Sequence, residues 1–183
     1  MIDKTVTTET QPVKPAVKTT CARLRWLFWG LALGGTGLDL WTKQAAFSSL
    51  RETGRLEVVP GFLALQTALN DGAAFSLASG QQAILCAVSL AALVVVLGLF
   101  HFGGPHGRLM TVSLGLFAGG IAGNLWDRLF NHGLVRDFID VYVGSHHWPT
   151  FNAADSLLCI AVGLLAISFL TSKPDPGRGR PRR

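Results

Sequence analysis

Four long apolar stretches alternate with more polar segments along the chain. They cover residues 24–47, 82–102, 109–130 and 152–171. Each has roughly 20 residues, the length at which an α-helix crosses the hydrocarbon core of a bilayer. The pattern predicts four membrane-spanning helices packed as a bundle.

The segment 56–77, between the first two apolar stretches, follows a different pattern. Side-chain character alternates along 56–58 and 62–69, a period typical of β-strands. Pro60-Gly61 and Asn70-Asp71-Gly72 are turn signals beside these runs. We therefore predict an all-α membrane protein, a four-helix bundle with a small extracytoplasmic β-sheet, or cradle, between its first two helices.

Composition and charge agree with a membrane protein. The 183 residues are 49% hydrophobic and 15% charged, with a net charge of +5, which is unusual for a soluble domain. Of the 16 basic residues, five lie before or at the start of the first stretch, Arg108 lies between the second and third, and five follow the last. These eleven share one side of a four-helix bundle, so both termini are predicted to be cytoplasmic. Their positions do not form a nucleic-acid-binding groove, and no nucleic-acid partner is expected.

Two polar tails flank the apolar region. Residues 1–22 are rich in Thr, Lys and Pro, and residues 173–183 in Pro, Gly and Arg. Neither contains an apolar run, so both are predicted to be disordered cytoplasmic tails. Residues 23–172 then form one integral membrane domain.

Small residues recur on the predicted helices. Gly115, Gly119 and Gly123 are spaced by four, as are Gly30 and Gly34. This spacing lets helix backbones approach closely in lipid, and we interpret both sets as packing positions. The three cysteines fit no metal-binding spacing, and we assign them no chemistry.

Two groups of polar residues interrupt the apolar stretches. Asp39 and Lys43 are four apart on the first predicted helix and can form an ion pair, although Lys43 could instead reach the headgroups. Asn124, Asp127 and Arg128 share one face of the third helix. We expect a basic partner to neutralise Asp127, and for Arg128 structural and substrate-holding roles remain open.

Asp137 and Asp155 lie at the two ends of the segment that joins the last two helices. Asn152 and Asp155 fit an N-cap and an acidic first turn, where the helix favours the ionised carboxylate. Two nearby carboxyls can share a proton and activate water. Asp140 follows Asp137 by three, so alternation predicts that one faces inward and the other faces water, without saying which.

Two function classes fit these acids. One is an aspartic protease that uses a carboxyl pair. The other is a small proton-coupled membrane transporter in which Asp39, Asp137 and Asp155 form a relay. A relay should spread its acids across the bilayer, whereas Asp137 and Asp155 are predicted to cluster at one face.

Five ordered blocks make the chain resemble the lipoprotein signal peptidases (signal peptidase II), intramembrane aspartic proteases. The blocks begin with Asp39-Leu-Trp-Thr-Lys43 and Asn70-Asp-Gly72-Ala-Ala-Phe-Ser76, and continue with Gly123-Asn124-Leu-Trp-Asp127-Arg128, Val135-Arg-Asp137-Phe-Ile-Asp140 and Trp148-Pro-Thr-Phe151-Asn152-Ala-Ala-Asp155-Ser156. Together they span most of residues 24–171. Each block alone is weak, but five in order are specific.

The resemblance implies roles for residues in these blocks. Asp137 and Asp155 would be the catalytic dyad, with Asp140 a non-catalytic neighbour. The substrate-binding or dyad-supporting residues would be Asn70, Gly72, Asn124, Arg128 and Asn152, and the structural polar residues would be Asp39, Lys43 and Asp127.

The resemblance also implies a substrate and a location. The enzyme would remove signal peptides from bacterial prolipoproteins, cutting before the diacylglyceryl-modified cysteine. It would work in the bacterial inner membrane, with its active site at the extracytoplasmic face. The lipid bilayer and the prolipoproteins are the expected partners, and no metal, cofactor or obligate protein partner is expected.

The chain departs from the family pattern next to the predicted dyad. Arg136 stands before Asp137 where the family usually has an apolar residue, and the stretch between Asp127 and Asp137 is one residue longer than usual. Both departures bear on the loop shape and the charge around Asp137.

Overall fold

The computed structural model describes residues 16–72, 80–103 and 106–171, so residues 1–15, 73–76 and 173–183 of the predicted tails and blocks lie outside the described residues. Within the described part, the helices are α1 (Ala16–Ser49), α2 (Gln82–Phe102), α3 (Arg108–Phe130) and α4 (Ala153–Thr171). Their bounds follow the predicted spans closely, except that α1 begins well before residue 24.

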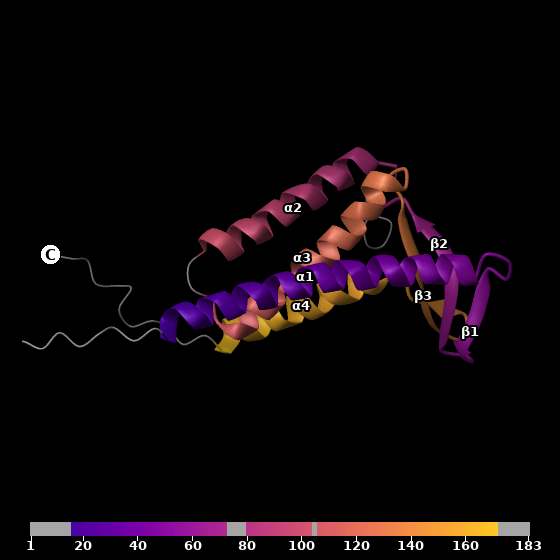
Figure 1. The fold of residues 1–183 in the computed structure, drawn as a ribbon. Helices are drawn as coiled ribbons and strands as arrows, with labels where there is room; N and C mark the ends of the chain where they lie inside the picture. Colours follow the sequence, from indigo (N-terminus) through magenta and orange to yellow (C-terminus); the bar gives the residue numbers. More distant parts are fainter. Residues whose placement is uncertain (1–15, 73–79, 104–105, 172–183) are drawn as a thin grey trace, which may run out of the picture.

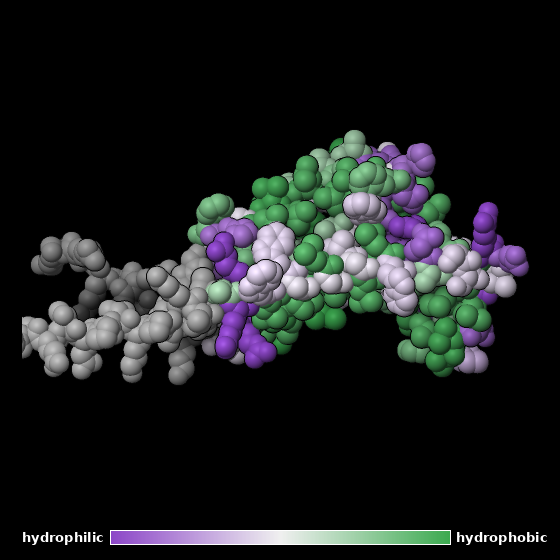
Figure 2. Space-filling model, viewed as in Figure 1, coloured by the Kyte–Doolittle hydropathy of each residue, from purple (hydrophilic) through white to green (hydrophobic). Residues whose placement is uncertain are grey.

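Three of the described helices, α2, α3 and α4, are long and apolar enough to cross a membrane. Asp39 and Lys43 lower the mean hydropathy of α1, and α1 is not among the helices that qualify as membrane spans by length and hydropathy. Figure 2 shows hydrophobic surface along the middle of the helices and hydrophilic residues towards the two ends. The chain therefore has membrane-embedded character.

The apolar core lies where α1, α2 and α3 meet. Phe28 of α1 and Phe100 of α2 stack with their ring centroids 3.8 Å apart, and Leu114, Ala118 and Ile121 of α3 belong to the same buried cluster. On its other side α3 packs against α4. The most buried of the three candidate spans is thus also the central one.

Glycines bring α3 close to α1, as the spacing in α3 predicts. A Cβ added at Gly115 or Gly119 would come within 3.0 Å of a backbone carbonyl oxygen of α1. The same prediction is wrong for Gly30 and Gly34, because no described atom lies within 4 Å of a Cβ built at either position. Gly35 is the α1 glycine that faces Gly119.

One four-stranded antiparallel sheet, with strand order β1-β2-β3-β4, forms from two distant segments. The strands are β1 (Arg55–Val59), β2 (Leu63–Asn70), β3 (Val135–Val143) and β4 (His146–His147). The predicted hairpin at Pro60-Gly61 is present, with Gly61 at φ 78°. However, half of the strands come from the connection between α3 and α4, so placing the sheet only between the first two helices was incomplete.

The sheet lies at one end of the bundle (Figure 1). There α1 and α3 end and α2 and α4 begin, whereas the start of α1 and the end of α4 lie at the opposite end (Figure 1). β2 and β3 pair so that Asn70 is opposite Val135 and Ala68 is opposite Asp137. This pairing brings residues from distant parts of the chain to the mouth of the bundle.

Candidate active site

The first turn of α4 holds Asp155 through a reciprocal cap. The Asp155 backbone N–H donates to Asn152 Oδ1 at 3.0 Å, and the Asn152 N–H donates to Asp155 Oδ2 at 3.1 Å. Each side chain thus satisfies a backbone donor that the start of the helix leaves without an intrahelical partner. This confirms the predicted cap and fixes one oxygen of the Asp155 carboxyl.

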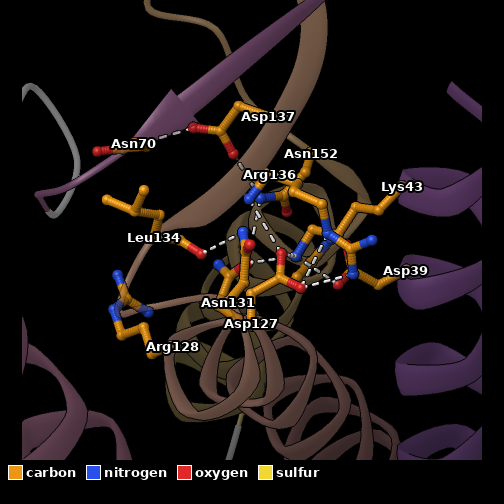
Figure 3. Close-up of polar contacts among 12 residues, drawn as sticks. Asp39, Lys43, Asn70, Asp127, Arg128, Asn131, Leu134, Arg136, Asp137 and Asn152 are labelled. Atoms are coloured by element: carbon orange, nitrogen blue, oxygen red, sulfur yellow. Dashed lines mark hydrogen bonds and ion pairs between the residues drawn. The ribbon is translucent and has the colours of Figure 1, made fainter. Parts of the chain in front are cut away.

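Amide side chains connect Asp155 with Asp137. Asn152 Nδ2 donates to Asp137 Oδ1 at 2.6 Å, and Asn124 Nδ2 donates to Asp155 Oδ1 at 2.8 Å. Asn70 Nδ2 donates to the other Asp137 oxygen at 3.0 Å, and Figure 3 shows Asp137 between Asn70 and Asn152. Residues from β2, β3, α3 and α4 therefore meet around the two carboxyls.

Asp137 is nearly inaccessible to solvent, with 2% of its surface exposed. Burial is the main cause that raises the pKa of its carboxyl from 3.8 to about 6, and the nearby Asp155 carboxyl acts in the same direction. The hydrogen bonds from Asn70 and Asn152 oppose this rise without cancelling it. Asp137 therefore keeps its proton to a higher pH than an ordinary aspartate.

Asp140 lies apart from this pair. Its carboxylate accepts hydrogen bonds from Arg55 Nη1 at 2.6 Å and His147 Nδ1 at 2.9 Å. Burial alone would raise the pKa of Asp140, but these two bonds lower it below its ordinary value. The expectation that one of Asp137 and Asp140 would face water is wrong, because both are buried.

A buried ionic cluster lies beneath the carboxyl pair. Lys43 Nζ is 2.7 Å from Asp39 Oδ2 and 3.1 Å from Asp127 Oδ2, and it donates to Asn124 Oδ1 at 2.9 Å. The predicted Asp39–Lys43 pair is confirmed, and the side chain of Lys43 is fully buried rather than extended to the headgroups. Asp39 also accepts the backbone N–H of Ala154 at 2.8 Å, which ties the start of α4 to α1.

Arg128 lies beside the carboxyls with part of its bonding capacity unused. Its Nη2 donates to the Gly72 carbonyl at 3.3 Å, while its buried Nε has no hydrogen-bond partner among the described residues. Gly72 N–H in turn donates to Asn70 Oδ1 at 2.9 Å. The predicted residues Asn70, Gly72 and Arg128 are thus linked to one another.

A cavity of about 840 Å³ opens onto both Asp137 and Asp155. Asn70, Gly72, Asn124 and Arg128 also line it, together with apolar side chains of β2 and α4 such as Leu69, Leu158 and Ile160. Asp140 is not among the lining residues. The cavity has the usual character of a binding site, apolar walls with a few converging polar groups.

Sequence analysis assigned no role in the site to several residues of the cavity wall, and it named residues 148–150 only as part of a family block. Residues 148–150, before Phe151, line it from the connection between β4 and α4, and Cys159 lines it from α4. No periodicity predicts where an irregular segment turns, and a cysteine in an apolar helix has no distinguishing pattern. Among the described residues, no three His, Cys, Asp or Glu side chains are placed to hold a metal ion.

Comparisons with known proteins agree with this architecture. A family model described as signal peptidase (SPase) II matches residues 31–171. A lipoprotein signal peptidase of Rhodopirellula baltica is 41% identical over 160 residues, covering 78% of this chain and 71% of that protein. A lipoprotein signal peptidase of Aquifex aeolicus is 36% identical over 154 residues, covering 81% of this chain and 89% of that protein.

A solved structure described as a bacterial membrane enzyme has a TM-score of 0.69 to this chain at 27% sequence identity, covering 90% of this chain and 95% of that one. The likeness extends over the helices and the sheet together, so the fold agrees with the sequence matches. The chain therefore belongs to the signal peptidase II family of bacterial membrane proteases.

Proposed function

We propose that the chain is an intramembrane aspartic endopeptidase that removes signal peptides from bacterial prolipoproteins, cutting before the diacylglyceryl-modified cysteine. The observation that carries the proposal is the placement of Asp137 and Asp155 at one cavity, joined through Asn152 and Asn124. Family membership supplies the substrate class. A carboxyl pair of this kind can activate water without a metal.

Asp155 and Asp137 take different parts in the proposed reaction. The ionised Asp155, at the N-terminus of α4, takes a proton from a water molecule held between the carboxyls. The resulting hydroxide adds to the scissile carbonyl carbon. Asp137 starts protonated, which its raised pKa favours, and it hydrogen-bonds the carbonyl oxygen.

The second half of the reaction breaks the peptide bond. The tetrahedral intermediate collapses, the C–N bond breaks, and a carboxyl proton passes to the leaving amine. One water molecule is consumed, and the dyad returns to sharing one proton. Asn70, Asn124 and Asn152 hold the two carboxyls in place throughout, because each donates to a carboxyl or to another amide of the group.

The cavity wall suits a substrate anchored in lipid. Leu158 and Ile160 of α4 offer apolar contacts below the dyad, on the side of the helices. Arg128 also lines the cavity. Its Nε has no hydrogen-bond partner among the described residues, and its guanidinium could bind a substrate carbonyl. We therefore place the signal helix along α4 and the scissile peptide beneath the end of β2, where Leu69 and Asn70 line the cavity.

The proposal includes a membrane orientation. All four helices cross the bilayer, with α1 included because Asp39 and Lys43 neutralise each other inside the bundle. Both termini are cytoplasmic, and the sheet and the dyad are extracytoplasmic. The clustering of basic residues near the termini supports this direction.

A proton-coupled transporter is not favoured. Asp39, the third acid of that relay, is bonded to Lys43 and to the backbone of Ala154. Asp137 on β3 and Asp155 in the first turn of α4 line the same cavity, and β3 and the start of α4 lie at one end of the bundle (Figure 1). Family membership also indicates a protease.

The test is cleavage by the purified full-length protein in lipid. A diacylglyceryl-modified prolipoprotein and the same precursor without the modification are compared, and the products are identified by mass. The proposal predicts one new N-terminus, at the modified cysteine, in the modified precursor only. Cleavage at another bond, or no cleavage by folded protein, would contradict it.

A further inference from the structure

Arg136 directs its side chain away from the cavity, although it is next to Asp137 in the chain. Its Nη2 and Nε lie 2.7 and 3.1 Å from Asp127 Oδ1, and its backbone N–H donates to Asp127 Oδ2 at 3.0 Å. Nη1 also donates to Gln44 Oε1 at 3.3 Å. Arg136 of β3 is thus attached to α3 by three hydrogen bonds to Asp127 and to α1 by one hydrogen bond to Gln44. Figure 3 shows Arg136 beside Asp127.

The charges of the buried cluster balance only when Arg136 is counted. Asp39, Asp127 and Lys43 have fully buried side chains, and that of Arg136 is 19% exposed. With all four ionised, two carboxylates face two cations and the net charge is zero. Without Arg136, one lysine would face two buried carboxylates, which is an unfavourable arrangement.

Lys43 connects this balance to the carboxyl pair. Its Nζ donates a hydrogen bond to Asn124 Oδ1 and lies within ion-pair distance of both Asp39 and Asp127, so one ammonium group serves all three residues. Asn124 then donates to Asp155. If Asp127 lost its second cation, Lys43 would be drawn towards Asp127 at the expense of Asn124, and the support of Asp155 would weaken.

The backbone of Arg136 acts on the other member of the pair. Arg136 directly precedes Asp137, and its backbone N–H donates a hydrogen bond to the Asp127 carboxylate. The start of β3 is therefore held against the end of α3, at the point where Asp137 enters the cavity. The same carboxylate, Asp127, accepts both this bond and the guanidinium.

We propose that Arg136 is a positioning residue for the peptidase reaction: by neutralising Asp127 it leaves Lys43 free to orient Asn124, and by its backbone bond it sets the position of Asp137. The inference rests on the proposed function of the dyad. Arg136 touches neither carboxyl of the pair, so its action is indirect.

The test compares four variants in the prolipoprotein cleavage assay: Arg136→Gln, Arg136→Lys, Asp127→Asn and the double variant Arg136→Gln/Asp127→Asn. Arg51→Gln is the matched control, because Arg51 is an exposed cation at the same end of the molecule and has no ion pair among the described residues. We expect Arg136→Gln to lower kcat about tenfold or more, with KM changed less than about twofold. Arg136→Lys keeps the charge and should retain more activity than Arg136→Gln.

The double variant is decisive because it restores the charge balance, with Asp39 facing Lys43 alone. It should recover activity relative to Arg136→Gln, a non-additive result, and should fold even if Arg136→Gln does not. Wild-type kcat in Arg136→Gln, or a double variant no more active than Arg136→Gln, would overturn the inference while leaving the peptidase assignment intact. Absence of cleavage by the folded wild type would instead overturn the proposed function on which the inference rests.

Discussion

Two polar partners donate hydrogen bonds to the carboxyl of Asp137, and yet burial has the largest effect on its pKa. Two amides donate to it, from Asn70 and Asn152, and both bonds favour the charged form. Removal from water and the neighbouring Asp155 have the larger combined effect, so the pKa rises to about 6. This gives the two aspartates of the pair different environments, as a shared-proton mechanism requires.

The raised pKa of Asp137 predicts a pH-dependent effect on stability. Between its ordinary value of 3.8 and about 6, the folded chain binds the proton more tightly than the unfolded chain. The free energy of unfolding should therefore fall as pH rises through this window, by an amount on the order of 3 kcal/mol from this residue.

Asp137→Asn removes the titrating carboxyl, so comparing this variant with the wild type isolates the contribution of Asp137 to the pH dependence of stability. The difference in thermal midpoint between the variant and the wild type, measured in detergent, should move in favour of the variant between about pH 4 and pH 7. Any cost of placing an asparagine amide beside two donors at this position is the same at each pH. A difference that stays constant across this range would contradict the raised pKa.

Sequence pattern could not choose between Asp137 and Asp140, and the structure gives the physical reason. Alternation separates a buried face from a wet face only where one face of the strand is open to water. Here Asp137 is covered by amides at the bundle mouth, whereas Asp140 is covered by Arg55 and His147 within the sheet. The family resemblance singled out Asp137, and only Asp137 lines the cavity.

At the scale of elements, the helices were predictable and the sheet was only partly so. A local run of apolar residues predicts each helix. The bounds of α2 and the end of α4 agree with the predicted ones. The pairing of β2 with β3 joins residues more than sixty positions apart in the chain, and no local period encodes such a contact. The β1–β2 hairpin, which has its own turn signal, was predicted.

The approach of α1 to α3 depends on Gly123. A Cβ at this position would overlap the Asp39 carboxylate, which is held in place by Lys43 and by the backbone N–H of Ala154. Gly123→Ala should therefore destabilise the protein by about 1–3 kcal/mol, as overpacking of a close contact does. It should also reduce cleavage, because Asp39 supports the start of α4.

Gly37→Ala is the matched control for this prediction. It lies on α1 two residues before Asp39, and no described atom is within 4 Å of its added Cβ. Thermal midpoints of the two variants in the same detergent make the comparison. If Gly123→Ala were as stable as Gly37→Ala, the close packing of α1 on α3 would not be the constraint we infer.

At the scale of the whole molecule, the fold separates the apolar surface of the bundle from the polar residues inside it. Apolar side chains of α2 and α4 cover the outside of the bundle, and the polar residues of α1 and α3 lie inside it. The sheet closes one end, where both carboxyls and the cavity lie. This arrangement places the proposed catalytic carboxyls at the edge of an apolar environment.

The proposed orientation predicts where two reporters will work. Green fluorescent protein fused after Arg183 should fluoresce, because the C-terminus is predicted to be cytoplasmic. Alkaline phosphatase inserted after Gly144, in the exposed turn between β3 and β4, should be active, because that end is predicted to be extracytoplasmic. The reverse pattern would contradict the orientation and place the dyad on the cytoplasmic side.

The central claim is that Asp137 and Asp155 together hydrolyse the prolipoprotein signal peptide. The most direct measurement is the single-turnover cleavage rate of a diacylglyceryl-modified prolipoprotein by wild type, Asp137→Asn and Asp155→Asn, with Glu52→Gln, which removes an exposed carboxylate, as control. We predict that both Asn variants bind the precursor and lose at least about a thousandfold in rate, whereas Glu52→Gln cleaves at the wild-type rate. Cleavage at a comparable rate by either folded Asn variant would contradict the account.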